Sequence, residues 1–264
     1  MSKIPASEAE KVPSQTHVKE VRAEFDARAE TYSDLFSDAN KTGASVLFRL
    51  RAKIVASMLA QSTGSLLDCA CGSGEVTEDV IKAASFQKVW VNDISGEMLR
   101  RAQSRLAAHQ SKQEFFWLNS DVFALNPDDM HSRFDVILCL GLIAHSGRLD
   151  ELLALFRGML HDNGSVILQS SLLDHPGSRL IKLVTDRRHA AGAKYKFSFY
   201  TFDQIAKAAR NSGFEVEENR RFGLCIPFGD RLLGRANYFL ERTFASAMRS
   251  FGGEAILRLR KASR

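Results

Sequence analysis

The stretch that decides the fold is Leu66-Leu67-Asp68-Cys69-Ala70-Cys71-Gly72-Ser73-Gly74, in which an apolar run ends in an acid and passes into a glycine turn. A turn of this kind, followed by the helical pattern 75–84, is typical of a strand–turn–helix unit in a parallel sheet. Glycine lets the backbone approach a ligand closely, and the start of the next helix offers free N–H groups to an anion. Taken alone, the turn is a weak signal of a nucleotide-type site.

Short apolar runs alternate with helical patterns on both sides of this turn. The expected strands are Ser65–Cys69, Lys88–Asn92, Glu114–Leu118, Phe134–Leu140, Ser165–Gln169, Phe214–Glu218 and Ala255–Arg260. The expected helices are His17–Phe36, Ala44–Leu59, Glu75–Ala84, Gly96–His109, Leu149–Leu160 and Phe202–Asn211. This alternation predicts an α/β, Rossmann-like fold, in which a seven-stranded, mostly parallel sheet carries helices on both faces.

Three parts of the chain are distinguished by pattern. Residues 1–15 are polar and include two prolines, so we expect a disordered leader. We expect residues 16–62 to form an N-terminal helical lid, and residues 63–264 to form the ligand-binding domain. Two stretches, 175–200 and 224–253, do not fit the alternation, and we expect them to cover the active site as lid insertions.

Composition narrows the classes of protein. Hydrophobic residues make up 45% and charged residues 25%, which is ordinary for a globular chain. The longest apolar run is too short to cross a bilayer, and the leader lacks the apolar region of a signal peptide. The four cysteines form no CxxC pair, so we expect neither a disulfide framework nor a zinc site, and a reduced, cytoplasmic setting is the default.

The net charge of +5 is unevenly distributed, because residues 220–264 contain ten Lys or Arg against three acids. Basic segments of this kind suit an anionic substrate, nucleic acid or a lipid surface, and solvated surface charge is the plainer alternative. Within it, arginines alternate with apolar residues over 232–251. This pattern predicts either an interfacial helix in peripheral membrane contact, or a helix packed on the domain or on a second copy.

Two further acids follow neighbouring strands. Asp93 ends the second strand, nineteen residues beyond Gly74, where a carboxylate can accept hydrogen bonds from both ribose hydroxyls of a nucleoside. Asp121 follows the third strand, where it can accept from an adenine amino group beside Val122. For each acid the alternative is helix capping or a position at a solvated loop end. Because the carboxyl ends of parallel strands share one edge of the sheet, the three strand ends together predict a nucleoside site.

At this point a family resemblance can be stated. The run LLDCACGSG is followed by VNDISGEML, NSDV, RFDVILCLGLIAH, MLHDNGSVIL and YTFDQIAKAARNSGFEV. In order and spacing these runs resemble the class I S-adenosylmethionine-dependent methyltransferases, in particular the small-molecule branch that includes the ubiquinone-biosynthesis type. The resemblance implies an enzyme with S-adenosylmethionine as cofactor and a small-molecule acceptor.

The resemblance also implies cofactor contacts. The methionine part would be surrounded by Asp68, Ala70, Gly72 and Gly74, the ribose held by Asp93, and the adenine bordered by Ile94, Met98, Asp121 and Val122, with Cys139 beneath the sulfonium. Ala70 stands where the family commonly has glycine, which puts cofactor affinity in doubt unless its φ is negative. The pattern around Phe25 and Tyr32 resembles a segment that folds over the site in this branch.

The chemistry follows from the donor. A sulfonium is already an activated methyl donor, so no metal is expected, and the protein must place the acceptor and deprotonate it where it is a hydroxyl. Among possible acceptor atoms, O-methylation is favoured. His145, five residues past the fourth strand, is the candidate base, and the alternative is that it caps a helix or lines the pocket.

The candidate acceptor contacts combine aromatic and basic residues. They are Tyr32, Arg187, Arg188, Tyr195 and Tyr200. Such a group would suit an anionic aromatic, phosphorylated, sugar-type or lipid-linked acceptor, and core packing is the alternative for the aromatic members. The identity of the acceptor and the oligomeric state stay open.

Rival classes fit less well. A nicotinamide-dependent oxidoreductase needs a third glycine, but that position holds Thr77 or, in the other register, Ser73. Amino-methylating enzymes of nucleic acids typically carry a proline- and aromatic-containing loop after the fourth strand, and residues 141–144 lack both, so nucleic acid is not expected as a partner. A non-catalytic cofactor-binding protein, and RNA or protein as acceptor, are the remaining alternatives.

Overall fold

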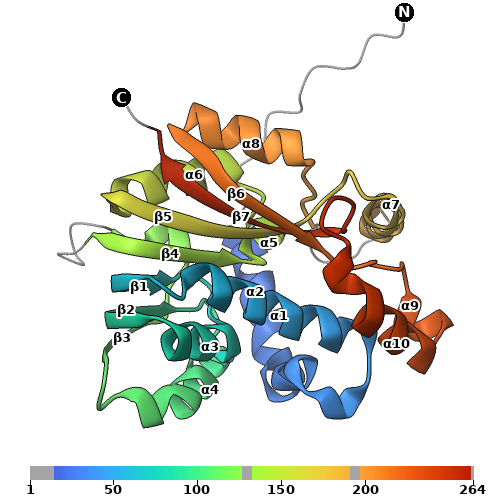
Figure 1. Cartoon of the computed structure of the whole chain (residues 1–264), viewed down its shortest axis with the longest axis horizontal. Coiled ribbons are helices and arrows are strands. Elements are labelled where there is room, and N and C mark those ends of the chain that lie inside the picture. The colour runs from blue at the N-terminus through green and yellow to red at the C-terminus, as the bar shows by residue number, and fades with distance from the viewer. Residues whose placement is uncertain (1–14, 127–132, 191–196, 263–264) are drawn as a thin grey trace, which may run out of the picture.

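A seven-stranded sheet forms the centre of the protein (Figure 1). The structure is a computed structural model, and it describes residues 15–126, 133–190 and 197–262. The strands are β1 (Thr63–Asp68), β2 (Ser85–Asn92), β3 (Glu114–Leu118), β4 (Phe134–Leu140), β5 (Leu160–Ser171), β6 (Phe214–Phe222) and β7 (Glu254–Lys261). Their order is β3-β2-β1-β4-β5-β7-β6, and β7 runs antiparallel to both of its neighbours. The predicted fold class is confirmed.

The strand order reverses between β1 and β4. β1 pairs with β2 on one side and with β4 on the other, so Asp68 at the end of β1 lies opposite Val91 and Leu138. In an open parallel sheet, the chain leaves these two strands in opposite directions and opens a crevice at their carboxyl ends. The decisive turn 68–74 therefore sits at the switch point.

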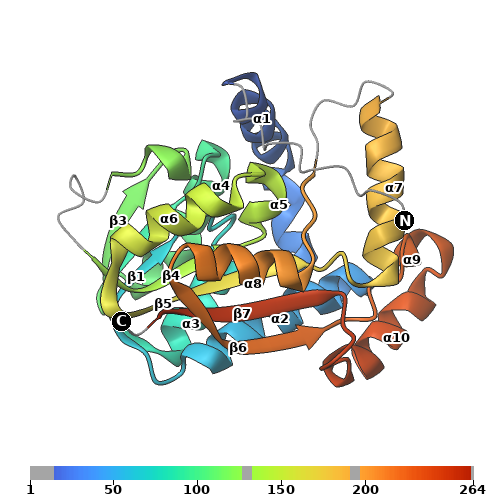
Figure 2. The same ribbon diagram turned by 90° about the horizontal axis from the view of Figure 1, so that it is seen from above.

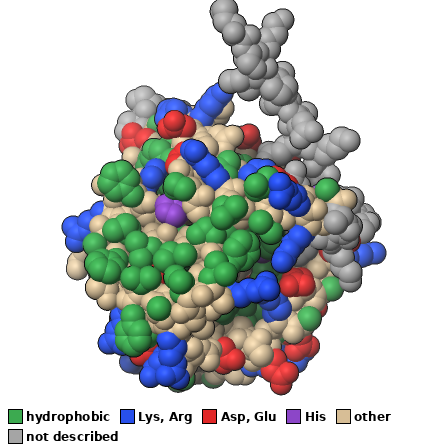
Figure 3. Space-filling model, turned by 90° about the vertical axis from the view of Figure 1, so that its right-hand side faces the viewer, with side chains coloured by type: hydrophobic (Ala, Val, Ile, Leu, Met, Phe, Trp, Pro, Cys, Tyr) green, Lys and Arg blue, Asp and Glu red, His purple; other side chains and the backbone are tan. Residues whose placement is uncertain are grey.

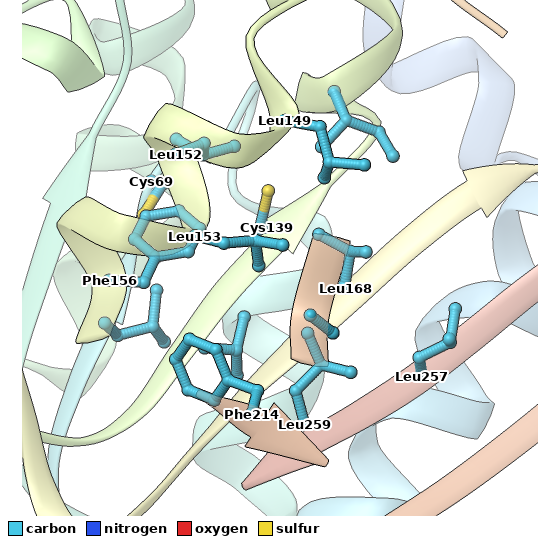
Figure 4. Packing of buried hydrophobic residues seen from close by; sticks show 14 of the residues in the cluster. Cys69, Cys139, Leu149, Leu152, Leu153, Phe156, Leu168, Phe214, Leu257 and Leu259 are labelled. Carbon is cyan, nitrogen blue, oxygen red and sulfur yellow. The ribbon is translucent and has the colours of Figure 1, made fainter. Parts of the chain in front are cut away.

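Helices cover both faces of the sheet because the strands are apolar on both sides. One face packs on α2 (Gly43–Leu59), α3 (Glu75–Ala83) and α4 (Gly96–Leu106), and the other on α6 (Leu149–Met159) and α8 (Phe202–Asn211). Successive β4 residues alternate between the two cores, since Leu138 belongs to the first and Cys139 to the second. Figure 4 shows Phe156 of α6 packed in the second core with Cys139.

The remaining helices lie around one edge of the sheet. They are α1 (Gln15–Tyr32), α5 (Leu142–Ser146), α7 (Pro176–Ala190), α9 (Gly229–Leu232) and α10 (Arg235–Phe244). Figure 2 shows α1 and α7 projecting on the same side of the molecule. α10 packs against α2, and Asp230 of α9 accepts from the backbone N–H of Gly43 at 2.6 Å, which caps the start of α2.

Two local expectations were wrong. The fifth strand was expected to begin at Ser165, after a helix ending at Leu160, but β5 begins at Leu160: Leu160 already pairs with Phe134, Ser165 pairs with Val136, and residues 161–164 lie in an irregularity between these two pairs. The predicted loop after β4 is the one-turn helix α5, bounded by Gly141 (φ 74°) and Gly147 (φ 63°). A single turn is too short to show helical periodicity in a sequence. The predicted leader lies largely outside the described residues.

Candidate functional site

A cavity of about 580 Å³ opens at the carboxyl ends of the strands. Its floor comes from the ends of β1, β2, β4 and β5 and the turn after β3, and its walls come from α1, α2, α5, α7 and residues 197–199. A volume of this size lies in the range of small-molecule sites. The parts that line it are far apart in the chain.

The glycine turn needs its glycines for different reasons. Gly72 has a φ of 54°, and a Cβ there would lie 3.0 Å from the ring of Tyr32. Gly74 has a φ of 84°, and a Cβ there would lie 3.1 Å from the Cα of Ala102 in α4, so this glycine serves helix packing. Gly72 lines the cavity together with Ala70, which is not among the described residues with positive φ. An alanine is therefore tolerated at this position of the turn, because its φ is not positive.

Asp68 shapes the turn from beneath. Its carboxylate accepts from Thr77 Oγ1 at 2.7 Å and more weakly from the backbone N–H of Ala70 at 3.4 Å. Burial raises the pKa of Asp68 to about 6, against the opposing effect of these hydrogen bonds. The side chain of Asp68 does not line the cavity, and in the structure it contacts the turn that borders the cavity.

Asp93 lines the cavity and is buried at the end of β2. One carboxylate oxygen accepts from the backbone N–H of Gly72 at 2.8 Å and the other from that of Ser95 at 2.9 Å. Burial raises the pKa of Asp93 to about 6, and the two hydrogen bonds oppose that rise. Neighbouring Asn92 donates to the carbonyls of Cys69 and Ser120, which fixes the ends of β1, β2 and β3 relative to one another.

The other predicted adenine contacts divide into two sets. Ile94, Asp121 and Val122 line the cavity, and Asp121 also caps the turn that follows it by accepting from the N–H of Phe123 at 3.1 Å. Met98 is fully buried inside the core at α4 and does not reach the cavity. Cys139 is likewise buried in the core, because alternate β4 residues face opposite sides, and Leu140 and Gly141 line the cavity instead.

Helix α1 closes the cavity over the turn. Asp26 of α1 accepts from Ser95 Oγ at 2.5 Å and from the backbone N–H of Glu97 at 3.4 Å, so α1 is docked on the start of α4. On the cavity side, Tyr32 lies against the glycine turn, and burial raises the pKa of its hydroxyl. Arg51 of α2 opposes that rise, since its guanidinium stabilises the ionised phenol.

His145 lies on α5 and lines the cavity between two aromatic rings. The centroid of Phe25 is 5.0 Å from the imidazole centroid, and that of Phe197 is 5.1 Å away. His17 of α1 forms a 2.8 Å hydrogen bond with the backbone carbonyl of His145. Burial lowers the pKa of His145 to about 4, and the charge of nearby Arg28 adds to this. The imidazole is therefore neutral at physiological pH.

The predicted acceptor contacts are mostly elsewhere. Tyr32 lines the cavity, but Arg187 and Arg188 are exposed on the last turn of α7, and Tyr200 is buried in the core beside α8. Tyr195 falls outside the described residues. The face of α7 that reaches the cavity carries Ser178, Ile181 and Thr185, at helical spacing. The predicted cluster of aromatic and basic side chains does not form, because the last turn of α7 carries its two arginines away from the cavity.

The sequence did not predict a polar group where β5 ends and β7 begins. Glu254 of β7 accepts from Ser171 Oγ at 2.5 Å and from the side-chain amide of Gln169, and burial raises its pKa. All three line the cavity, and the Oε1 atom of Gln169 is buried without a hydrogen-bond partner. It points towards the end of β4, since a Cβ on Gly141 would lie 3.8 Å from it.

Comparison with known proteins decides the family. Residues 41–219 match a family model described as a methyltransferase domain. The chain belongs to this family. It is a class I methyltransferase that uses S-adenosylmethionine, as the sequence resemblance implied. No curated protein matches the methyltransferase in sequence.

Solved structures share the fold of the methyltransferase. Magnesium protoporphyrin IX methyltransferase from Synechocystis PCC 6803, with bound SAH, aligns with a TM-score of 0.65 at 14% identity, over 93% of this chain and 99% of that chain. The mycolic acid cyclopropane synthase CmaA1, complexed with SAH and CTAB, aligns with a TM-score of 0.60 at 14% identity, over 92% and 97%. The mitomycin 7-O-methyltransferase MmcR aligns with a TM-score of 0.59 at 14% identity, over 90% and 60%.

The cavity of the methyltransferase fits the charged and polar parts of S-adenosylmethionine. The Nε atom of Arg51 is buried without a hydrogen-bond partner, and its guanidinium lies beside Tyr32 and within electrostatic reach of Asp68. A cation at that place suits the carboxylate of the methionine part. Besides this unpaired donor, the Oδ1 atom of Asn92 is a buried acceptor without a partner. Among the described residues, no three His, Cys, Asp or Glu side chains cluster as metal ligands.

Proposed function

We propose that the protein transfers the methyl group of S-adenosylmethionine to an oxygen atom of a small, largely apolar acceptor held in the cavity. One observation carries this: a single cavity joins the strand ends that bear Asp93 and Asp121 to an apolar wall from α1, α7 and residues 197–199. Gly141, which directly follows β4, also lines this cavity. Because the cofactor supplies an activated methyl group, the remaining task of these residues is to place the acceptor in line with it.

The cofactor end is assigned as follows. Asp93 accepts hydrogen bonds from the ribose hydroxyls, and Asp121 accepts from the adenine amino group, with Ile94 and Val122 beside the ring. The backbone of 70–72 borders the methionine part, and Arg51 pairs with its carboxylate. This assignment gives a partner to the Nε atom of Arg51, which is buried without a hydrogen bond in the protein, and a buried donor left unpaired would be costly.

The acceptor end favours an apolar molecule with one hydroxyl. Phe25, Phe197 and Ile181 offer apolar contacts, and the Oε1 atom of Gln169 offers a buried acceptor for a hydroxyl hydrogen. Arg187 and Arg188 are outside the cavity, so support for an anionic acceptor no longer comes from them. An apolar pocket with few convergent polar groups is the usual form of a small-molecule site.

His145 is proposed to remove the hydroxyl proton. The depressed pKa keeps the imidazole neutral and able to accept a proton, although the same depression makes it a weak base. Its ring is held between Phe25 and Phe197 on the apolar wall, close to where an acceptor would lie. The competing role is that the ring only shapes the wall.

The test pairs cofactor binding with turnover over a panel of phenols, alcohols and amines. His145→Ala should lower kcat by about a hundredfold, the contribution expected of a weak general base, with little change in the Kd of S-adenosylhomocysteine measured by calorimetry. His161→Ala, at an exposed histidine early in β5, is the matched control and should be silent. Full activity of His145→Ala would show that the residue only shapes the cavity wall and does not act as the base. Exclusive methylation of amines would refute an oxygen atom as the acceptor.

A further inference from the structure

The exposed large hydrophobic side chains of the described residues all lie in two segments. These segments, 175–190 and 224–253, carry Leu180, Leu183, Phe228, Leu232, Leu233, Phe239, Phe244 and Phe251. We call this set the apolar surface. Two of its members are largely uncovered, with 71% of Leu232 and 80% of Phe251 exposed. Scattered apolar residues are normal on a soluble protein, but their confinement to adjoining segments marks an interaction site.

The segments lie on one side of the molecule. Helices α7, α9 and α10 form the right-hand side of Figure 1, and the view onto that side in Figure 3 shows a broad area of apolar side chains with Lys and Arg around it. α10 explains why apolar groups face outward. Asn237, Tyr238 and Glu241 turn inward towards the domain, which leaves Phe239 and Arg235 on the outer face.

Both acids of the second segment are used inside the protein. Asp230 accepts from the N–H groups that start α2, and buried Glu241 accepts from the N–H groups of Leu224 and Cys225 at 3.0 and 2.8 Å. The charges of this segment that remain on its outer side are arginines, and on α7 the acid Asp186 is paired with Lys182. Arg231, Arg235 and Arg249 are exposed and form no ion pair with any described residue, and Arg242 bonds the hydroxyl of Tyr238.

This charge pattern separates two partners. In a two-fold dimer, each arginine would meet the same patch of a second copy, so like charges would be brought together in an apolar contact. An anionic lipid surface instead pairs with the arginines while its acyl region receives the leucines and phenylalanines. We propose that the apolar surface docks on a bilayer that contains anionic phospholipid. No described helix is long and apolar enough to span a membrane, so the docking is peripheral.

Docking would also bring the active site beside the lipid. α7 belongs to both features, because Ser178, Ile181 and Thr185 line the cavity while Leu180 and Leu183 face outward. One wall of the cavity would then lie against the bilayer, where apolar acceptors concentrate. This consequence rests on the proposed function, but the docking itself does not.

The test is co-sedimentation of the full chain with vesicles. Binding should be strong to mixed phosphatidylcholine and phosphatidylglycerol, weak to phosphatidylcholine alone, and reduced by high salt. Leu232→Glu should weaken partitioning by more than about tenfold, because an apolar contact is replaced by a charge. Arg235→Glu should weaken it by at least about fivefold. Arg101→Glu, an equal charge reversal at an exposed residue of α4, is the matched control and should bind as the wild type does.

Fold and cofactor site are checked in each variant by circular dichroism and by S-adenosylhomocysteine binding, so that a docking defect is distinguished from unfolding or from failure of the proposed function. Wild-type binding by both surface variants would overturn the proposal. Absence of vesicle binding by the wild type would also overturn it. In that case, a concentration-dependent dimer that is seen by light scattering and lost in Leu232→Glu would assign the surface to a second copy of the chain.

Discussion

Protonation of Asp93 should affect cofactor binding and protein stability in opposite directions. Its carboxylate accepts from two backbone N–H groups and is proposed to hold the ribose hydroxyls, and burial raises its pKa to about 6. From about pH 7 to about pH 5, the fraction of Asp93 that is ionised falls from roughly nine-tenths to roughly one-tenth. If the charged form is the one that binds, affinity for S-adenosylhomocysteine should fall by about tenfold over this interval.

Stability of the cofactor-free protein should respond with the other sign. The folded pKa of Asp93 is raised from 3.8, so protonation favours the folded state, and this stabilisation is lost as pH rises through about 6. From about pH 7 to about pH 5, the group should add roughly 1 kcal/mol to the free energy of unfolding. His145 opposes it, because its lowered pKa makes protonation favour the unfolded state by roughly 2 kcal/mol over the same interval.

The opposing titrations are separated by comparing the wild type with Asp93→Asn, which keeps the shape of the side chain. Urea unfolding of each form at both pH values isolates the Asp93 contribution as the difference of differences, and calorimetry with S-adenosylhomocysteine gives the binding trend. Asp93→Asn should bind weakly at both pH values and without the tenfold slope. An affinity of the wild type that is flat between the two pH values, or an identical slope in Asp93→Asn, would refute the reasoning.

Three further changes test the frame of the site. Thr77→Val removes the hydrogen bond to buried Asp68 and should lower the free energy of unfolding by about 2 kcal/mol in urea titrations, whereas an unchanged value would mean that water replaces the hydroxyl. Gly74→Ala forces a side chain into a φ of 84° against α4 and should cost roughly 1–2 kcal/mol in thermal unfolding, whereas Gly158→Ala, with nothing within 4 Å, should stabilise α6 slightly. Asp26→Ala undocks α1 from α4, so hydrogen exchange should rise in α1 and the Kd for S-adenosylhomocysteine should increase, while retained protection would show that Asp26 is dispensable.

The parts that the sequence predicted are those set by local patterns. β4 has the predicted bounds, because a continuous apolar run bordered by turn residues defines a buried strand without reference to the rest of the chain. Asp93 and Asp121 reach the cavity because parallel strands bring their carboxyl ends to one edge, a consequence of topology that follows once the alternation is recognised. The sequence was enough to single out these two acids, whereas the contacts around them were visible only in the structure.

The parts that the sequence did not predict depend on which way a side chain turns. Arg51, Gln169 and Glu254 come from α2, β5 and β7, and no short motif joins them, so their meeting in one cavity could not be read from spacing. The direction of a side chain also explains why Arg187 and Arg188, which were predicted to contact the acceptor, lie outside the cavity. They are close in sequence to residues that line the cavity, but the helix directs them outward.

The basic C-terminal region shows how one compositional signal can have two physical meanings. On β7, Arg258 lies 3.7 Å from Glu217, Arg260 lies 2.7 Å from the same carboxylate, and Lys261 lies 3.3 Å from Asp162. These cations pair with neighbouring acids, so the plain interpretation of surface charge holds for them, and such pairs contribute little. The arginines of 224–253 differ because the acids of their own segment are committed to backbone N–H groups inside the protein. Charge excess becomes available to a partner only where the fold has already used the balancing acids, and that condition is met beside the apolar surface and not on β7.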